Sequence, residues 1–283
     1  MGKTKNKEDK PFNRLAAEFQ WTPDLDEDHI FPREREMILK LRDANPDIQD
    51  WSDKLILYFL FARRHDLEKT QELLDLNVKM LKEMNLYGRR LTRKEIADLD
   101  VGRYMFFANT VDVHDRILVF LDMSKADPKR NRKQFLWPAV WYEIQFHTDV
   151  YTVRYLRNGL VLVGNMEGMY ANHDPAIKQM DTSSEGKEAS KGMMGLFPRR
   201  VRQMAVVNGG AIFKIVYQIA KTIMPRKMTK RVAMIGNEDL KKLVPASSLP
   251  PLVGGTTDLT VEKFVRDLDE YDARYTLSEQ KPI

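Results

Sequence analysis

The sequence predicts an α/β protein in two parts: a small all-helical domain at residues 29–99 and a larger lobe at residues 100–262 with a mainly parallel sheet. Two observations carry this prediction. Apolar residues recur at helical spacing from residue 32 to about residue 81, and no strand pattern interrupts them. From about residue 104 onward, short apolar runs typical of buried strands alternate with longer helical patterns. Such alternation favours right-handed crossovers and a parallel sheet covered by helices.

The helical part contains three predicted helices. The first follows Pro32 and ends at Asn45-Pro46, because the residue before a proline resists helical dihedral angles. The second begins after Ser52 and the third after Asp66, since both residue types are good helix N-caps. The polar residues 1–28 are predicted to be a mobile extension.

The predicted elements of the lobe follow in order. Strands are expected at residues 104–109, 116–122, 160–163, 204–207 and 232–235. Helices are expected at residues 134–158, 211–224 and 237–243, and a helical tail at residues 263–283.

The net charge of the chain comes from one segment. The sequence has 46 Lys and Arg against 41 Asp and Glu, for a net charge of +5. Ten of the bases lie between Ala189 and Asn237, where there is no acid, so the remainder of the chain has 36 bases and 41 acids. A basic segment of this kind suits an anionic lipid surface, where each nearby base contributes about 1 kcal/mol.

The middle of the basic segment is an apolar helix pattern at residues 211–224. Its polar positions include Lys214, Gln218 and Lys221, which fall on one narrow stripe. One interpretation is a core helix with a solvated edge. The other is a helix that meets lipid, because it is apolar over most of its circumference and has cations at its far end.

Several classes of protein are disfavoured. No apolar run approaches the roughly 18 to 20 residues that span a bilayer, and the N-terminus lacks the pattern of a signal peptide, so we expect a cytoplasmic protein. Cysteine is absent, which excludes disulfides and thiolate metal sites. No catalytic motif surrounds any serine, and the five histidines are scattered. We therefore expect neither an enzyme nor a metal or other cofactor.

A nucleic-acid-binding protein is a further alternative. Its phosphate-contacting face would consist of Arg199, Arg200, Arg202, Arg226, Lys227, Lys230 and Arg231. No base-reading module accompanies these residues, and the apolar helix among them offers nothing to duplex DNA. We expect no nucleic-acid partner.

Four segments in order resemble the CRAL-TRIO lipid-transfer family: Leu60–Asp66, Met166–Met169, Phe197-Pro198 and Val244–Gly255. The resemblance covers roughly residues 33 to 262. It implies a helical domain, and a lobe whose sheet floors an apolar cavity closed by a mobile gate helix. Residues 211–224 occupy the gate position. The cavity lining would include Leu160, Leu162, Phe213 and Tyr217.

Three positions also match the phosphatidylinositol-binding branch of that family, related to the yeast secretory phosphatidylinositol transfer protein. The resemblance implies that Arg63, Glu188 and Lys221 hold the lipid headgroup. The chemistry is coherent, because a phosphodiester needs cationic donors and inositol hydroxyls need an acceptor. Taken alone, Arg63 is better explained as the solvated end of a helix, Glu188 as a surface acid and Lys221 as the exposed edge of its helix. Only the joint match of the three favours the headgroup site.

The expected ligand is a phospholipid, phosphatidylinositol, exchanged at anionic membrane surfaces by a monomeric carrier. Leu160 and Leu162 stand where that branch has two hydroxyl-bearing residues that help hold phosphatidylcholine, which puts exchange of that lipid in doubt. The alternative is a small hydrophobic ligand of the tocopherol or retinoid type. Membrane docking is expected through Arg226, Lys227, Lys230 and Arg231.

Overall fold

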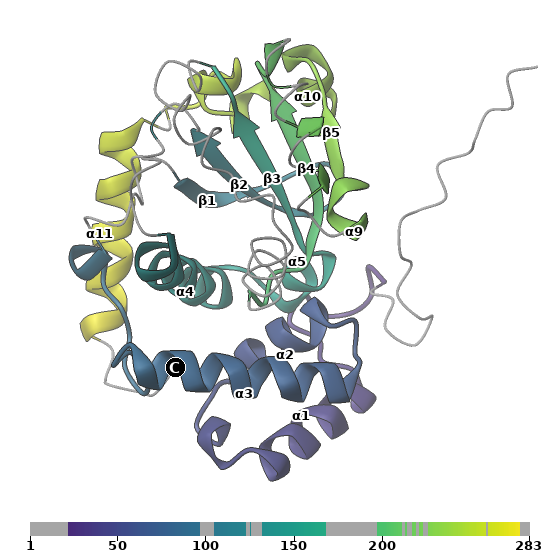
Figure 1. Cartoon of the computed structure of the whole chain (residues 1–283), viewed down its shortest axis with the longest axis vertical. Coiled ribbons are helices and arrows are strands. Elements are labelled where there is room, and N and C mark those ends of the chain that lie inside the picture. Colours follow the sequence, from purple (N-terminus) through teal and green to yellow (C-terminus); the bar gives the residue numbers. More distant parts are fainter. Residues whose placement is uncertain are drawn as a thin grey trace, which may run out of the picture.

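The computed structural model describes residues 22–96, 105–122, 125, 132–167, 197–210, 213, 217, 218, 221, 222, 226–258 and 260–277. They form a helical unit at one end of an α/β lobe (Figure 1). The α/β architecture with a mostly parallel sheet is as predicted.

The helical unit contains α1 (Pro32–Ala44), α2 (Asp53–Ala62) and α3 (Leu67–Glu83), with 3-10 turns at Pro46–Ile48 and Arg93–Ile96. The predicted caps are confirmed. Ser52 Oγ accepts a hydrogen bond of 3.2 Å from the Leu55 amide, and Asp66 Oδ1 accepts one of 3.1 Å from the Lys69 amide. These bonds satisfy amides that the first helical turn leaves without partners.

The sheet has five strands in the order β1-β2-β3-β4-β5. β1 and β2 are antiparallel, and the pairs β2–β3, β3–β4 and β4–β5 are parallel. The bounds are β1 Met105–Val111, β2 Ile117–Asp122, β3 Leu160–Asn165, β4 Val201–Val207 and β5 Val232–Met234. The strands thus agree with the predicted ones to within a few residues.

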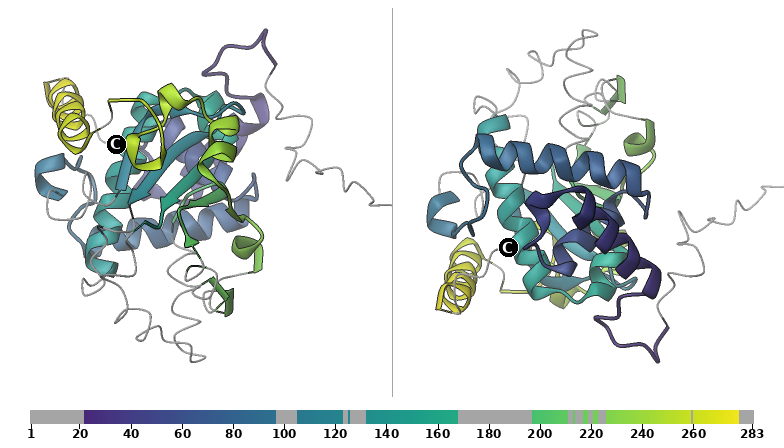
Figure 2. Two further views of the ribbon diagram at one scale, coloured as in Figure 1. Left: turned by 90° about the horizontal axis from the view of Figure 1, so that it is seen from above. Right: turned by 90° about the horizontal axis from the view of Figure 1, so that it is seen from below.

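The described helices of the lobe surround this sheet (Figure 2). They are α4 (Arg132–Val150), α5 (Val153–Asn158), α9 (Arg226–Thr229), α10 (Asn237–Leu243) and α11 (Val261–Leu277), with 3-10 turns at Ala246–Ser248 and Pro251–Val253. α11 stands beside β1, where Phe264 packs against Phe106 and Phe107 at ring-centroid distances of 5.4 and 5.3 Å.

The single helix predicted at residues 134–158 is broken in two, which the sequence did not predict. The Asp28 carboxylate accepts a 3.0 Å hydrogen bond from the Val153 amide. The Glu27 carbonyl accepts one of 2.8 Å from the Arg154 amide. Residues from the predicted extension therefore cap the first turn of α5, and a new helix begins there.

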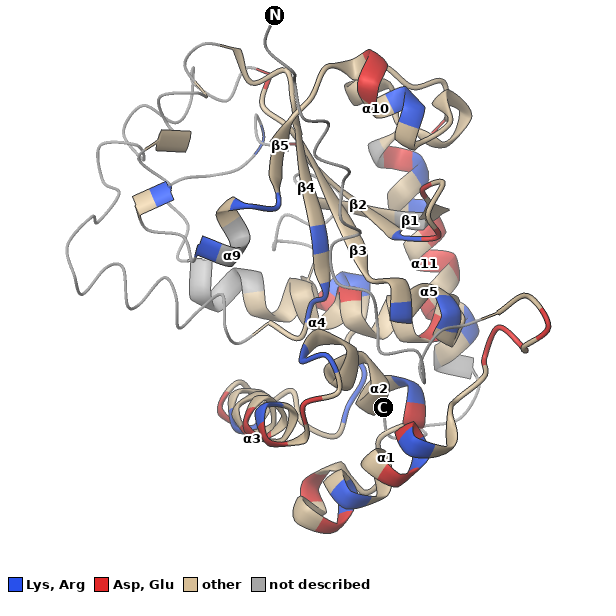
Figure 3. Cartoon of the chain, turned by 90° about the vertical axis from the view of Figure 1, so that its right-hand side faces the viewer, with Lys and Arg blue, Asp and Glu red and all other residues tan. Residues whose placement is uncertain are grey.

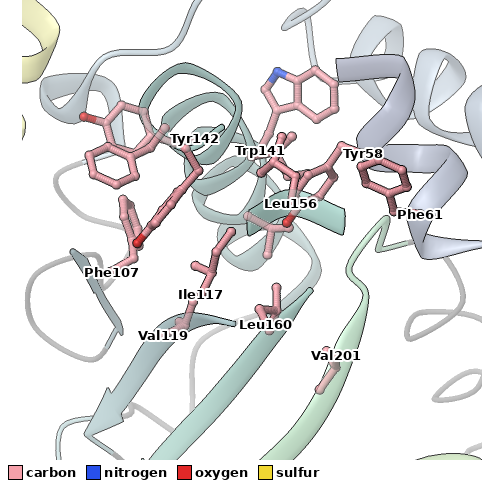
Figure 4. Close-up of a cluster of buried hydrophobic side chains, with 14 of the residues drawn as sticks. Tyr58, Phe61, Phe107, Ile117, Val119, Trp141, Tyr142, Leu156, Leu160 and Val201 are labelled. Atoms are coloured by element: carbon pink, nitrogen blue, oxygen red, sulfur yellow. The ribbon is translucent and has the colours of Figure 1, made fainter. Parts of the chain in front are cut away.

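One row of side chains crosses the whole sheet. Residues paired across strands point to the same face, and the strand register gives the row Phe107–Val119–Leu162–Met204–Val232. α4 covers the β1 end of this row, where Phe107 lies 5.0 Å from Phe146 and 6.2 Å from Tyr142 between ring centroids. Figure 4 shows Ile117, Val119 and Leu160 pointing toward the aromatic residues of α4. We call this surface the α4 face of the sheet.

The apolar core runs without a break from the helical unit into the lobe. Trp51, just before α2, lies 5.7 Å from Trp141 of α4 between ring centroids. Tyr58 of α2 lies 6.3 Å from His147 of α4. α2 therefore packs directly on the helices that cover the sheet.

Candidate functional site

The predicted cavity residues fall in two separate apolar clusters on the α4 face, and their role in a cavity stays a prediction. Leu160 and Leu162 point to this face from β3, because alternate residues of a strand share a face. Phe213 and Tyr217 form a separate apolar cluster with Met166 and Val206, against which Met204 and Val232 also pack. The β5 end of the α4 face is thus covered by residues of the segment 211–224.

The local sequence explains how this segment leaves β4. Asn208 has a φ of 55°, and Gly210 a φ of 56°, so the chain turns sharply after the strand. At Gly209 a Cβ would lie 3.0 Å from Phe213 Cβ, so a larger residue would require the Phe213 side chain to shift by a few tenths of an ångström. Asn208 Nδ2 donates a 2.8 Å hydrogen bond to Asn165 Oδ1, which ties the ends of β3 and β4 together.

Lys221 lies at the edge of the cluster. Its Nζ is 4.6 Å from the centroid of the Tyr217 ring, a cation–π contact, and the residue is exposed. Tyr217 Oη donates a 2.7 Å hydrogen bond to the Thr229 carbonyl of α9. Burial raises the pKa of Tyr217, so the ring stays a neutral surface for the ammonium group.

The predicted headgroup residues are described in part. Arg63 is the C-cap of α2 and is half-buried. Burial lowers its pKa, and the nearby charge of Glu72 acts in the opposite direction. Lys221 lies near the end of the connection between the parallel strands β4 and β5. Glu188 lies outside the described residues, and the assignment of all three remains a prediction.

The predicted docking residues surround α9. Arg226 and Lys230 are exposed, Lys227 belongs to the same short helix, and Arg231 is half-buried just before β5. Their role in docking to a membrane stays a prediction.

Four arginines from three chain segments lie close together, which the sequence did not predict. We call this group the arginine cluster: Arg64, Arg200, Arg202 and Arg231. Arg64 belongs to the turn between α2 and α3, Arg200 and Arg202 to the start of β4, and Arg231 to the residue before β5. β4 and β5 are parallel, so both start at the same end of the sheet. Figure 3 shows basic residues on the first part of β4, before β5 and above α3.

The electrostatics confirm that these charges are neighbours. Burial lowers the pKa of Arg200 to about 9, helped by the charges of Arg202, Arg64, Arg157 and Arg231. Burial likewise lowers the pKa of Arg202 to about 10, with further effects from Arg116, Arg64 and Arg231. Arg64 therefore acts on both arginines of β4. Burial lowers the pKa of Arg231, and the charge of Arg64 lowers it further. A cation that is both desolvated and surrounded by cations favours an anionic ligand.

A second polar group, beneath α4, is structural. Arg199 pairs with the buried carboxylate of Glu143, and Tyr58 Oη lies 3.4 Å from His147 Nδ1. Burial raises the pKa of Glu143, while Arg199 opposes that shift. Because Arg199 is turned inward to this pair, it does not belong to an exposed phosphate-contacting face of the kind that nucleic-acid binding would need.

Two kinds of feature are missing from the described ranges. No helix there is both long and apolar enough to cross a bilayer. In the same ranges, no group of three or more His, Asp or Glu is placed to hold a metal ion.

Comparisons with known proteins identify the family. The family model of the CRAL/TRIO domain matches residues 102–255, more than half of the chain. The chain belongs to the CRAL/TRIO domain family. This domain binds lipids or other small hydrophobic ligands, which agrees with the apolar α4 face and the segment that covers it.

Individual relatives are distant. A CRAL-TRIO domain-containing protein of Dictyostelium discoideum is 23% identical over 263 residues, 91% of this chain and 97% of that protein. The tyrosine-protein phosphatase non-receptor type 9 of Homo sapiens is 20% identical over 198 residues, which cover 70% of this chain and 32% of the phosphatase. The crystal structure of Sfh5 aligns with a TM-score of 0.48 at 14% identity, covering 91% of this chain and 99% of that one.

Proposed function

We propose that this protein is a non-enzymatic carrier that takes phosphatidylinositol into an apolar cavity on the α4 face and exchanges it at anionic membranes. One observation carries the proposal. Leu160 and Leu162 of β3 share a sheet face with the surface on which Phe213 and Tyr217 pack, and Lys221 lies beside Tyr217. A cation thus borders the apolar surface, as a phospholipid with buried chains and a phosphate at the rim would require.

Movement of the segment 211–224 would open the cavity. Its described residues are held to the lobe by a small cluster and by the bond from Tyr217 to Thr229, apart from the main core. The glycines at 209 and 210 supply the conformational freedom that a hinge needs. Detaching this cluster would therefore leave the main core intact.

The first experiment identifies the ligand. Protein purified under native conditions is extracted, and the extract is analysed by mass spectrometry. Phosphatidylinositol as the main species supports the proposal, whereas a tocopherol-like or retinoid-like molecule favours the alternative carrier. The alternative is supported by the purely apolar floor at Leu160 and Leu162. The recovery of no lipid or hydrophobic ligand from freshly purified protein would contradict both.

The second experiment tests whether Lys221 helps to bind the lipid headgroup. We expect Lys221→Ala to slow transfer of phosphatidylinositol between vesicles about tenfold, corresponding to the loss of one charge-assisted contact of about 1.4 kcal/mol. Lys221 is exposed, so its replacement should not change the unfolding temperature. Lys214→Ala, in the same segment, is the matched control and should retain transfer. Equal rates for Lys221→Ala and the unmodified protein would remove Lys221 from the headgroup site.

A further inference from the structure

A cavity lies between the helical unit and α4, and its volume is about 250 Å³. Its lining comes from the segment between α1 and α2, from α3 and the loop after it, and from α4. No residue of the sheet belongs to the described lining, so the cavity is separate from the α4 face. Sites for drug-sized ligands measure roughly 300–1,000 Å³, so this one suits a smaller molecule.

Three aromatic side chains line this cavity: Trp51, Tyr87 and Trp141. The two tryptophan rings lie 5.7 Å apart between centroids, and both residues are almost fully buried. Tyr87 is held in place because its Oη donates a 2.6 Å hydrogen bond to the Asp47 carbonyl. The faces of aromatic rings, tryptophan above all, attract cations. We call this space the aromatic cavity.

A cation of the chain already uses part of this surface. Lys82 Nζ lies 2.8 Å from each carboxylate oxygen of Asp47, and 5.1 Å from the centroid of the Tyr87 ring. Lys82 is not among the described lining residues of the aromatic cavity. Tyr87 and a neighbouring carboxylate thus hold one ammonium group outside the cavity, which shows that the combination suits a cation.

Asp50 supplies a second carboxylate. It is exposed, as is Gly88, so these two lining residues mark where the aromatic cavity opens. No ion pair within the described ranges engages Asp50. Burial raises the pKa of Tyr87, and the charges of Asp47 and Asp50 raise it further, against the opposing charge of Lys82. The negative charge of Asp50 thus reaches the aromatic ring, and a cation in the cavity would balance it.

One donor at the aromatic cavity lacks an acceptor. Trp141 is 2% exposed, and its Nε1 is buried and has no hydrogen-bond partner in the described part of the chain. A buried indole N–H group usually finds a partner, and leaving it unpaired is costly. An oxygen atom of a bound molecule would supply the missing acceptor.

The walls favour one kind of cation. A primary ammonium group carries three N–H donors, and burying these donors against aromatic carbon leaves them without acceptors. A quaternary ammonium group has no N–H group, so it can lie against aromatic rings at no such cost. A molecule that joins this group to an oxygen atom a few bonds away would satisfy the rings, Asp50 and Trp141 together.

We infer that the aromatic cavity binds a small soluble quaternary ammonium compound of the choline type. Its trimethylammonium group lies among Trp51, Tyr87 and Trp141 near the Asp50 carboxylate, and its oxygen accepts a hydrogen bond from Trp141 Nε1. The site is independent of the proposed phosphatidylinositol site. The end of α3, which borders the cavity, lies on the side of α11, whereas α9 lies at the opposite edge of the molecule (Figure 1).

Titration of the full chain with three related compounds tests this chemistry. Trp51 and Trp141 are two of the four tryptophans, so intrinsic fluorescence reports on the cavity, and calorimetry gives the affinity. Choline should bind at constant ionic strength. Its neutral isostere, in which a tert-butyl group replaces the trimethylammonium group, should bind at least about tenfold more weakly. Tetramethylammonium, which lacks the oxygen, should bind about fivefold more weakly.

Two variants assign the binding to named residues. Asp50→Asn should weaken choline binding about fivefold, the value of one partly exposed charge. Trp141→Phe keeps an aromatic ring but removes the donor, so it should weaken binding of choline and not of tetramethylammonium. Asp43→Asn is the matched control, because it removes an exposed charge of α1 outside the cavity and should leave the affinity unchanged. If Trp141→Phe folds poorly, Asp50→Asn and its control still decide the outcome, since both positions are exposed.

Four results would overturn the inference. Three concern the site: no binding of choline, equal affinity for choline and its neutral isostere, or equal affinities of the Asp50→Asn and Asp43→Asn variants for choline. The fourth concerns the source of the ligand. Phosphatidylcholine vesicles should not displace choline from the protein, and displacement by them would mean that a lipid headgroup, not a soluble compound, occupies the cavity.

Discussion

At the scale of single residues, burial decides which groups are chemically active. His147 is a fully buried residue of α4, beside Tyr58 and Glu143. Burial, and then the charge of Arg199, lowers its pKa from 6.5 to about 3. The ring is therefore neutral in the folded protein at physiological pH, and the scattered histidines of the sequence include at least one that is part of the core.

This neutral histidine predicts a pH dependence of stability. Above pH 6.5 the ring is neutral in both the folded and the unfolded chain, so it has no effect. As the pH falls from 6.5 toward 3, the unfolded chain binds a proton that the folded protein excludes. The free energy of unfolding should thus fall by up to about 1.4 kcal/mol per pH unit from this residue alone. Urea unfolding at a series of pH values measures the slope.

Two histidine variants test whether His147 causes this pH dependence of the free energy of unfolding. His147→Gln should be less stable near neutral pH but show a shallower slope between pH 6.5 and 3. His114→Gln, in the exposed turn between β1 and β2, should keep the slope of the unmodified protein. Identical slopes in all three proteins would mean that His147 is not buried in its neutral form.

At the scale of elements, the connection between α5 and β3 holds a position that only glycine can occupy. Gly159 has φ 80° and ψ −162°, a region essentially restricted to glycine. A Cβ there would also approach the Arg200 carbonyl to 2.5 Å. That carbonyl accepts the 3.0 Å hydrogen bond from the Leu160 amide that starts the β3–β4 pairing.

Two glycine substitutions distinguish the energetic cost of backbone strain from that of the close approach between position 159 and the Arg200 carbonyl. Gly159→Ala should lower the free energy of unfolding by at least about 3 kcal/mol, because it combines strain with a backbone clash. Gly88→Ala, with φ 72° and open space around it, should lower it by about 1 kcal/mol from strain alone. Urea unfolding compares the two. Similar losses in the free energy of unfolding for the two variants would mean that β3 and β4 can move apart at position 159.

The elements also show what the sequence can predict. The starts of α2 and α3 depend on Ser52 and Asp66, whose side chains cap amides three residues away. Such local signals are visible in the sequence. The start of α5 depends on Glu27 and Asp28, which lie more than 120 residues earlier in the chain. No local pattern contains that contact, so a single long helix was predicted.

The same reasoning applies to the candidate site. Strand periodicity and the family resemblance predicted one cavity lined by apolar residues of β3 and of the segment 211–224. The structure places these residues in two separate clusters, and the cavity stays a prediction. The arginine cluster could not be predicted, since its members come from three segments and Arg200 and Arg202 appeared only as part of a general basic surface. Only the parallel pairing of β4 and β5, and the position of the α2–α3 turn, bring these residues together.

At the scale of the whole molecule, basic charge is divided between two kinds of position. Arg200 and Arg202 are largely enclosed at the start of β4, whereas Arg226 and Lys230 are exposed around α9. Enclosed arginines bind a ligand at close range, and exposed ones attract a charged surface over a longer distance. The exposed group lies next to the segment 211–224, so attraction to a membrane would bring that segment to the lipid.

This arrangement predicts a salt-dependent transfer rate. The triple variant Arg226→Glu, Lys227→Glu and Lys230→Glu should slow lipid transfer to anionic vesicles at low ionic strength, since each base contributes about 1 kcal/mol near such a surface. Arg231 is left unchanged because it is half-buried within the arginine cluster. The difference from the unmodified protein should shrink in high salt, where the screening length falls from about 10 Å at 0.1 M to about 3 Å at 1 M.

A matched triple variant in the helical unit isolates the role of α9. Arg35→Glu, Lys40→Glu and Lys79→Glu change the net charge by the same amount at exposed positions of α1 and α3. If α9 faces the membrane, this control should transfer lipid almost as fast as the unmodified protein at every salt concentration. Equal slowing in both triple variants would mean that net charge alone governs the approach, and that the segment 211–224 does not determine which side of the molecule meets the lipid.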